Sequence, residues 1–332
     1  MRKLKIGVLG SGDIATRVSN TLRHVEEIEL YAVASRTYAH ARDFGEKFGY
    51  CKIYETYDEV LDDPDVDLVY VGLHHTQHYE YAKKCLDKRK PTLLEKPFTI
   101  NHYQTQALLR EFKENGVFLC EALWTRFIPM RRRIEEIVSK GMIGEPRMID
   151  VNMMFRICDN PRMTELEKGG GALLDLGVYA LNFASMFFGN EVEEMTSLST
   201  FWKTGADEQE AVLMKYPNHR IAVCKISMLG GGSAKGIIYG TAGRIEVDNV
   251  MNLDHALVYN AEGEVMEELS KEKENAGYES GYMYEFLACR QAIQNNMLEC
   301  GEMPHEETRF LMEQYDRLRA AWGFDYPCEM GL

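Results

Sequence analysis

The stretch from Ile6 to Ala15 constrains the fold more than any other part of the chain. A short apolar run ends in Gly10-Ser11-Gly12, and a helical pattern starts directly after it at Asp13 and Ile14. Gly10 allows a tight turn, Gly12 lets a ligand approach the backbone, and the small Ala15 allows close packing of helix on strand. This G-x-G-x-x-A spacing predicts a dinucleotide-binding βα unit whose helix N-terminus holds the phosphates.

Apolar runs alternate with helical patterns over the first third of the chain. Continuous apolar strands separated by helices are typical of a parallel sheet covered on both faces, so we predict a doubly wound Rossmann domain over residues 1–121. Its expected strands are Lys5–Leu9, Glu29–Ala34, Asp67–Gly72, Pro91–Leu94 and Val117–Cys120, and its expected helices are Asp13–Val25, Ala39–Phe48, His78–Asp87 and Asn101–Asn115.

From residue 122 onward, strand-like runs follow each other with few helices between them. This pattern predicts an α+β domain with a large, mostly antiparallel sheet over residues 122–332. Its expected strands are Arg147–Phe155, Glu194–Trp202, Gln209–Tyr216, Arg220–Met228, Ala234–Tyr239 and Arg244–Val247, and its expected helices are Arg131–Ser139, Ala172–Phe188, Gly281–Asn296 and His305–Ala321.

The end of the second predicted strand indicates which dinucleotide is bound. NAD-dependent enzymes usually place an acidic residue there to bind the ribose hydroxyls, whereas this chain has Ser35 and Arg36. A hydroxyl and a guanidinium bind a 2′-phosphate that a carboxylate would repel. We therefore expect NADP as the cofactor, with dual use of NAD as the alternative.

Charge and cysteine content limit the partners and the compartment. The 332 residues carry a formal net charge of −14, and an acidic surface repels nucleic acid and anionic membranes. Its eight cysteines include no C-x-x-C pair, which is typical of reduced thiols in a cytoplasmic protein. The crowded His74, His75 and His78 lack a carboxylate or cysteine at useful spacing, so we expect no metal there.

The helix predicted at Ala172–Phe188 is almost entirely apolar, yet it carries Asp175, Tyr179 and Asn182. Their i, i+4, i+7 spacing places them on one face of a helix. Buried polar side chains are unfavourable unless they are hydrogen-bonded or used in chemistry. The stripe is therefore a candidate catalytic face, with simple core hydrogen bonding as the alternative.

Several motifs together resemble the Gfo/Idh/MocA family of oxidoreductases. They are the glycine loop, the Glu95-Lys96-Pro97 turn followed by Asn101, and the Gly169-Gly170-Gly171 triplet before Asp175. Within that family, the runs Glu121–Phe127 and Gly170–Tyr179 resemble the dimeric dihydrodiol dehydrogenases and the NADP-dependent xylose dehydrogenases most closely.

The resemblance implies roles for individual residues. Lys96 and Tyr179 would share proton transfer, where many family members have histidine in place of Tyr179, and Asp175 would orient the substrate or Lys96. A tyrosine is a poor base at its usual pKa near 10 unless a neighbouring ammonium group lowers it. The resemblance also places Glu95 and His75 beside the nucleotide. Candidates for the substrate pocket are Trp124, Arg126, Phe127, Phe155 and Arg156, with ordinary packing or a surface ion pair as the alternative for each.

The expected function is hydride transfer between NADP and a CH–OH group of a sugar or cyclic diol. Two alternatives stay open: a redox-neutral enzyme with tightly held cofactor, such as an epimerase or eliminative glycosidase, and a non-catalytic nucleotide sensor. The resemblance further implies a homodimer or higher homo-oligomer through the second domain's sheet. The apolar residues expected to be available for that pairing are Met148, Val151, Met153, Val212, Met214, Val223, Ile226 and Met228.

Overall fold

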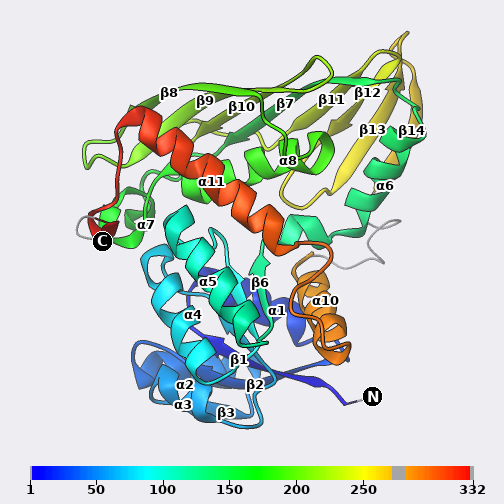
Figure 1. Cartoon of the computed structure of the whole chain (residues 1–332). Coiled ribbons are helices and arrows are strands. Elements are labelled where there is room, and N and C mark those ends of the chain that lie inside the picture. The colour runs from blue at the N-terminus through cyan, green and yellow to red at the C-terminus, as the bar shows by residue number, and fades with distance from the viewer. Residues whose placement is uncertain (1, 271–280, 330–332) are drawn as a thin grey trace. The chain divides into compact units, whose positions relative to one another are not determined.

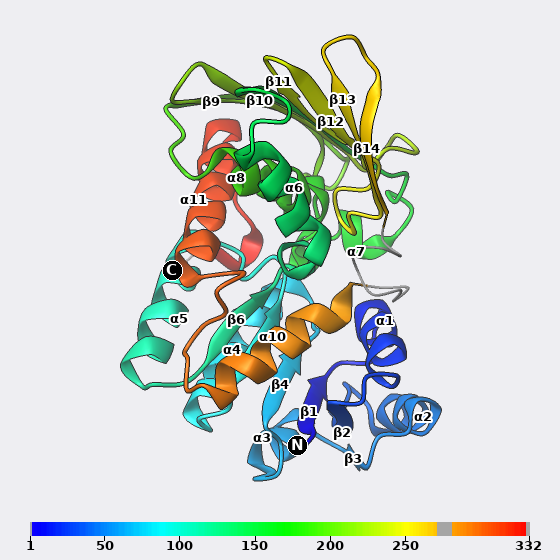
Figure 2. The ribbon, with the colours of Figure 1, turned by 90° about the vertical axis from the view of Figure 1, so that its right-hand side faces the viewer.

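A computed structural model describes residues 2–270 and 281–329 of the chain. It divides into two compact units (Figures 1 and 2). Unit 1 comprises Met1–Leu123 and Tyr282–Met312, and unit 2 comprises Trp124–Gly281 and Glu313–Leu332. The predicted boundary at residue 121 lies close to the first crossing. The prediction that 122–332 form one domain is corrected, because Tyr282–Met312 return to unit 1.

Unit 1 is built on a parallel sheet of strand order β3-β2-β1-β4-β5-β6, which confirms the doubly wound prediction. Helices α1 and α10 pack together, as do α4 and α5, and the two pairs lie on opposite faces of the sheet (Figure 2). The strands are β1 (Leu4–Leu9), β2 (Ile28–Ala34), β3 (Lys52–Tyr54), β4 (Leu68–Val71), β5 (Thr92–Glu95) and β6 (Leu119–Ala122). The helices are α1 (Asp13–Leu22), α2 (Tyr38–Phe48), α3 (Tyr57–Asp62), α4 (His78–Asp87), α5 (His102–Glu114) and α10 (Tyr282–Gln294).

Two elements of unit 1 were not predicted, the edge strand β3 and the short helix α3. All three residues of β3 are only half-buried, so the strand lacks the continuous apolar run that marks its neighbours. Helix α3 begins with a capping box in which Thr56 and Glu59 exchange hydrogen bonds. That box was a sequence signal for the helix start.

Unit 2 contains an eight-stranded sheet of order β14-β13-β12-β11-β7-β10-β9-β8, antiparallel except for the β7–β10 pair. Helices α6, α8 and α11 lie on the same face of it (Figure 1). The strands are β7 (Pro146–Met154), β8 (Glu194–Phe201), β9 (Asp207–Tyr216), β10 (Arg220–Ser227), β11 (Gly236–Gly240), β12 (Gly243–Val247), β13 (His255–Asn260) and β14 (Val265–Ser270), of which the last two were not predicted. The helices are α6 (Pro129–Ser139), α7 (Pro161–Thr164), α8 (Val178–Phe188) and α11 (His305–Trp322).

The helix predicted at Ala172–Phe188 consists of a π-helical turn, Leu173–Gly177, that continues into α8. It packs against β7 and β10. By length and composition, the stretch Leu166–Phe188 could span a membrane, but 89% of its most apolar window is buried inside the protein, as in the core helix of a globular fold.

Most of the apolar side chains predicted for the open face of the large sheet lie instead on its buried face. Side chains alternate along a strand, so Val151, Met153, Val212, Met214, Ile226 and Met228 all point into the core and are at most 1% exposed. Of the apolar residues predicted for the open face, Met148 is exposed and Val223 half-buried. The other large apolar residues exposed on the strands of this sheet are Leu198, Phe201, Leu213, Ile221, Tyr239, Val265 and Met266.

Candidate active site

The glycine loop of unit 1 has the geometry that its sequence predicts. Gly10 has φ +111°, and a Cβ there would lie 2.6 Å from the carbonyl oxygen of Gly72, so only glycine is accommodated. A Cβ at Gly12, the N-cap of α1, would meet no atom within 4 Å. The backbone N–H groups at the start of α1 are thus open to an anionic ligand, as a pyrophosphate requires.

Ser35 and Arg36 follow β2 directly, at the carboxyl edge of the sheet. The Ser35 hydroxyl is 2.7 Å from the hydroxyl of Ser11, so the strand end and the glycine loop are hydrogen-bonded to each other. Arg36 is exposed, and within the described ranges it forms no ion pair. This leaves its guanidinium available for an anion beside the loop.

The Glu95-Lys96-Pro97 turn is held in place by buried polar contacts. Tyr70 Oη donates to Glu95 Oε1 at 2.5 Å, and the Lys96 backbone N–H donates to Glu95 Oε2 at 3.0 Å. The ring of His78 lies 2.8 Å from the Pro97 carbonyl oxygen through Nδ1. Glu95 and His78 therefore fix the backbone of the turn, in which Lys96 is half-buried.

Two other polar residues of the predicted site near this turn, His75 and Asn101, are buried. His75 is buried in a 3₁₀ turn, His75–Gln77, with its ring 5.8 Å from that of His78. Asn101 caps α5, because its side chain accepts a hydrogen bond from the Gln104 N–H at 2.9 Å. The motif residue Asn101 thus has a local structural task.

We expect the stability of unit 1 to fall in mild acid through His78. Burial lowers the pKa of His78 to about 4, against about 6.5 in an unfolded chain. Between these values the unfolded chain binds a proton that the folded protein does not, so stability is full above pH 6.5 and decreases as the pH falls toward 4. The loss from pH 7.5 to pH 5 amounts to about 2 kcal/mol. Urea unfolding at both pH values should show it, and His78→Gln should flatten the dependence by that amount; an identical profile in the variant would refute this assignment.

Tyr179 of unit 2, one of the three polar residues predicted to share a helix face, is hydrogen-bonded to Trp124. Its side chain is 7% exposed, and the indole N–H of Trp124 donates to the Tyr179 hydroxyl oxygen at 3.0 Å. This bond occupies a lone pair of the Tyr179 oxygen. Trp124 thus fixes the position of the hydroxyl group.

Asp175 receives a charged partner that the sequence analysis did not identify. Arg162, on α7, contacts both Asp175 carboxylate oxygens, at 3.0 and 3.2 Å. Such a bidentate pair fixes the plane of the carboxylate. Asp175 is 8% exposed, whereas the side chain of Arg162 is 36% exposed, so water reaches the arginine side of the pair.

Arg126 holds the helix that carries Tyr179. Its guanidinium donates to Asn182 Oδ1 and to the Ser185 hydroxyl, each at 2.6 Å, and the side chain is 5% exposed. These bonds favour a positioning role over direct contact with substrate. Phe155, by contrast, is half-buried just past β7, and Arg156 is exposed and paired with Asp159 at 2.7 Å.

The start of the helical segment that carries Asp175 and Tyr179 is fixed by Asp207, which was not predicted from the sequence. Asp207 Oδ2 accepts the backbone N–H of Leu173 at 2.6 Å and is fully buried. A Cβ at Gly171 would lie 2.1 Å from Asp207 Oδ1. Glycine is therefore needed at position 171 to let this carboxylate reach the helix start, and no local sequence signal links Asp207 to it.

Unit 1 has a phosphate-binding βα loop on a doubly wound sheet, and unit 2 has a buried tyrosine and aspartate. Together these features are typical of a nicotinamide-dependent oxidoreductase. Residues 4–122 match the model of the oxidoreductase family with NAD-binding Rossmann fold, and residues 131–246 match the Gfo/Idh/MocA C-terminal domain. The chain belongs to the Gfo/Idh/MocA family.

Relatives and solved structures match the chain over nearly its whole length. Trans-1,2-dihydrobenzene-1,2-diol dehydrogenase of Danio rerio is 30% identical over 97% of this chain and 98% of its own, and the Homo sapiens protein of that name is 30% identical over 98% of both. The 3-ketoreductase KijD10 of Actinomadura kijaniata, solved with NADP and TDP-benzene, has a TM-score of 0.86 at 24% identity and covers 96% of this chain and 98% of its own. The aldose-aldose oxidoreductase of Caulobacter crescentus, solved with glycerol, has a TM-score of 0.85 at 21% identity, covering 96% and 97%.

Proposed function

We propose that this protein is an NADP(H)-dependent oxidoreductase that transfers hydride between the nicotinamide and a CH–OH group of a sugar or cyclic diol. The observation that carries the proposal is the Trp124–Tyr179 hydrogen bond at 3.0 Å, in a chain related end to end to dihydrodiol dehydrogenases. It fixes the position of a buried tyrosine hydroxyl, the group that accepts the substrate proton in this proposal. Non-catalytic nucleotide sensing has no use for such a group.

In this proposal, the residues around the glycine loop hold the cofactor. Gly10, Ser11, Gly12, Asp13 and Ile14 surround the pyrophosphate, Ser35 and Arg36 take the 2′-phosphate, and His75, Glu95 and Lys96 border the nicotinamide half. The open space at Gly12 and the ion-pair-free Arg36 support this fit. Bound there, the nicotinamide supplies the hydride acceptor or donor.

The remaining residues bind the substrate and move its proton. Tyr179 takes the proton from the substrate hydroxyl as hydride leaves the carbon, and returns it in the reverse direction. Lys96 supplies positive charge beside the reacting oxygen of the substrate. Asp175, oriented by Arg162, accepts a hydrogen bond from a second substrate hydroxyl. Trp124 and Phe155 provide apolar surface for the ring or carbon skeleton of the substrate. Arg126 positions Tyr179 indirectly, by holding helix α8.

Arg36→Ala should weaken the binding of NADPH but not that of NADH. Losing a charged hydrogen bond to phosphate lowers binding by about 1.5–3 kcal/mol, which is about a ten- to hundredfold rise in Kd for NADPH. The Kd for NADH should change little, because NADH lacks that phosphate. Calorimetric titration of both nucleotides measures this, with Arg42→Ala as the control, an exposed arginine of α2 that pairs with Asp43. Equal NADPH affinity in wild type and Arg36→Ala would exclude the assigned role.

The reaction type is tested by turnover with exchange of cofactor. Purified protein with NADP⁺ and a panel of aldoses and cyclic trans-diols should release NADPH into solution, seen by its absorbance. Conversion of substrate with no net change in free cofactor would instead indicate the redox-neutral alternative. Binding of NADPH without turnover of any panel member would favour a sensor.

The open face of the unit 2 sheet supports a homodimer. Met148 on β7 pairs in register with Ile221 on β10 and with Tyr239 on β11, and Val223 pairs with Leu213 on β9. These five apolar side chains are neighbours on one face of the sheet, next to the Asp150–Lys225 ion pair, and exposed apolar groups of this kind commonly mark interfaces.

Leu213→Asp should dissociate that dimer. A charge in the middle of an apolar contact is unfavourable because it loses its water. Light scattering after gel filtration should give twice the 38.1 kDa of one chain for wild type and the single-chain mass for the variant. Met297→Asp, at an exposed apolar position of unit 1, is the control. A monomeric wild type would exclude this interface.

The free state of all eight cysteines is in keeping with the further proposal of a reducing, cytoplasmic location.

A further inference from the structure

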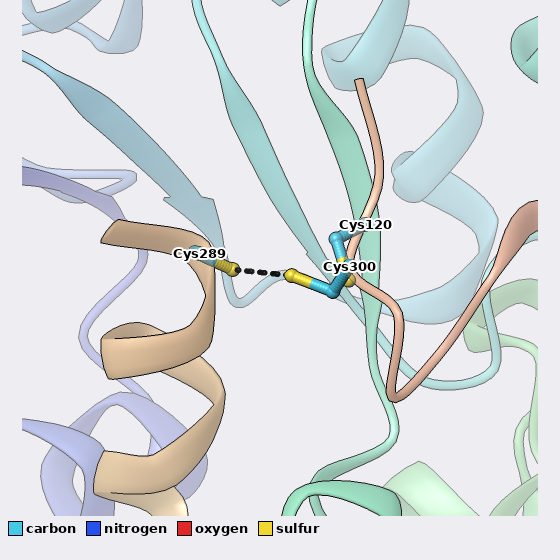
Figure 3. A group of neighbouring side chains, drawn as sticks. All are labelled: Cys120, Cys289 and Cys300. Carbon is cyan, nitrogen blue, oxygen red and sulfur yellow. Dashed lines mark hydrogen bonds between the residues drawn. The ribbon is translucent and has the colours of Figure 1, made fainter. Parts of the chain in front are cut away.

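Three cysteines that are far apart in the sequence meet in the core of unit 1 (Figure 3). Cys120 lies on β6, Cys289 on α10, and Cys300 in the segment that follows α10. Their Sγ atoms all lie within 4.8 Å of one another, and Cys289 and Cys300 are joined by a 3.8 Å S–H···S hydrogen bond. None of the three is more than 1% exposed. The active-site residues described above do not include them.

We propose that Cys120, Cys289 and Cys300 form a structural binding site for a thiophilic metal ion, namely Zn²⁺. Binding forms three Zn–S bonds and releases one proton to water from each thiol. The cation leaves the oxidation state of sulfur unchanged, so the step needs no oxidant.

The spacing of the sulfur atoms is close to that of a metal-thiolate site. A Zn–S bond of about 2.3 Å with tetrahedral angles separates two sulfur ligands by roughly 3.8 Å. The Cys289–Cys300 distance already has this value, and Cys120 lies within 4.8 Å of both. A shift of about one ångström in the third side chain completes the trigonal base of the site.

A candidate fourth donor lies one helical turn away, outside the group of three, and its carboxyl group would have to move towards the sulfur atoms to bind the ion. Glu285 precedes Cys289 by four residues, which places both side chains on the same face of α10. Glu285 is fully buried, and neither carboxyl oxygen has a hydrogen-bond partner in the part of the chain that the structure describes. Its carboxyl group interacts electrostatically with Cys300 and Cys120. A buried carboxyl group without hydrogen bonds is unfavourable, and coordination to a cation would satisfy it.

Burial distinguishes a metal site from a redox switch. Reactive thiols need solvent access, whereas these three are enclosed. Closed structural zinc sites are commonly buried, because the metal enters as the chain folds. The backbone around the site is already fixed: the Leu119 N–H donates to the Leu298 carbonyl at 3.0 Å, and His305 Nε2 lies 2.8 Å from the Leu119 carbonyl. The ion would fasten the returning segment Tyr282–Met312 to strand β6.

Metal content of the full-length protein tests the proposal without reference to turnover. Protein purified without chelator should contain about one Zn²⁺ per chain by mass spectrometry of the metal, and Cys289→Ala should contain none. Cys85→Ala is the matched control, because Cys85 is also fully buried in unit 1 but lies outside the group. Glu285→Ala should keep the site but raise the Kd for Zn²⁺ about tenfold or more.

A second measurement uses wild-type protein alone, so it does not depend on the folding of a variant. Protein produced in cobalt-supplemented medium should show the near-ultraviolet thiolate-to-cobalt charge-transfer absorption of a three-thiolate site. The proposal is overturned if wild-type protein contains no stoichiometric zinc and the cobalt-grown protein lacks this band. It is equally overturned if Cys289→Ala keeps its zinc, or if freshly isolated protein carries a Cys289–Cys300 disulfide.

Discussion

Tyr179→Phe should lower kcat by about a hundred- to ten-thousandfold, the usual contribution of a positioned acid–base group. The substitution removes one oxygen atom and leaves the aromatic ring in its place. Trp124 loses its acceptor at 3.0 Å, which lowers the free energy of unfolding by only about 1 kcal/mol. NADPH affinity should stay within experimental error, because Tyr179 lies outside the glycine loop. Steady-state turnover with the best substrate of the panel and calorimetry with NADPH measure the two effects separately.

The matched control for this substitution is Tyr216→Phe. Tyr216 is a buried tyrosine of the same unit, 1% exposed on β9, and its hydroxyl makes only a long contact to a methionine sulfur at 3.6 Å. Turnover should be unaffected by its loss. Wild-type kcat in Tyr179→Phe would remove the tyrosine from the mechanism, and an equal loss in both variants would indicate a general effect on packing.

Arg126→Met should lower the free energy of unfolding by about 3 kcal/mol, because two charge-assisted hydrogen bonds are lost and Asn182 keeps a buried acceptor. The loss should reach the active site, since Trp124 is two residues away in the same 3₁₀ turn, Trp124–Phe127. We expect a lower kcat with little change in KM. Urea unfolding and steady-state kinetics measure the two effects.

The control is Arg133→Met on α6, whose guanidinium forms partly exposed ion pairs with Glu136 and Glu267. Exposed pairs contribute about 1 kcal/mol or less, so this variant should resemble wild type. A strong rise in KM in Arg126→Met with unchanged stability would show instead that Arg126 contacts the substrate directly, as the sequence first suggested.

Features that depend on residues adjacent in the sequence could be predicted from it. The glycine loop is specified by local backbone requirements, and the φ of +111° at Gly10 is a case where only glycine serves. The buried parallel strands gave continuous apolar runs, so the sheet of unit 1 was recognised except for β3. Strand β14 lies at the edge of the second sheet, and only its Leu269 is buried. Strand β13 beside it buries Ala256 and Val258 alternately, but its sequence from Ala256 to Tyr259 is uniformly apolar and so lacks an alternating pattern.

The partners of the predicted site residues could not be found in this way. The sequence marked Asp175, Tyr179 and Asn182 as polar groups that need partners. Trp124 and Arg126 precede their partners Tyr179 and Asn182 by 55 and 56 residues, and such pairings are set by packing between elements. The cysteine group spans 180 residues between Cys120 and Cys300, which no motif spacing describes.

The return of Tyr282–Met312 to unit 1 sets an order of events during protein synthesis. The first 123 residues leave the ribosome without α10, which packs on α1 and covers one face of their sheet. Domains generally fold as they emerge, at about 5–20 residues per second. The nucleotide-binding unit therefore waits roughly ten seconds or more for its last helix, with apolar sheet surface uncovered, while the whole of Trp124–Gly281 is made. Truncation after residue 123 should give an insoluble fragment. A fusion that joins Tyr282–Met312 directly to the end of that fragment, without Trp124–Gly281, should restore unit 1 as one continuous chain.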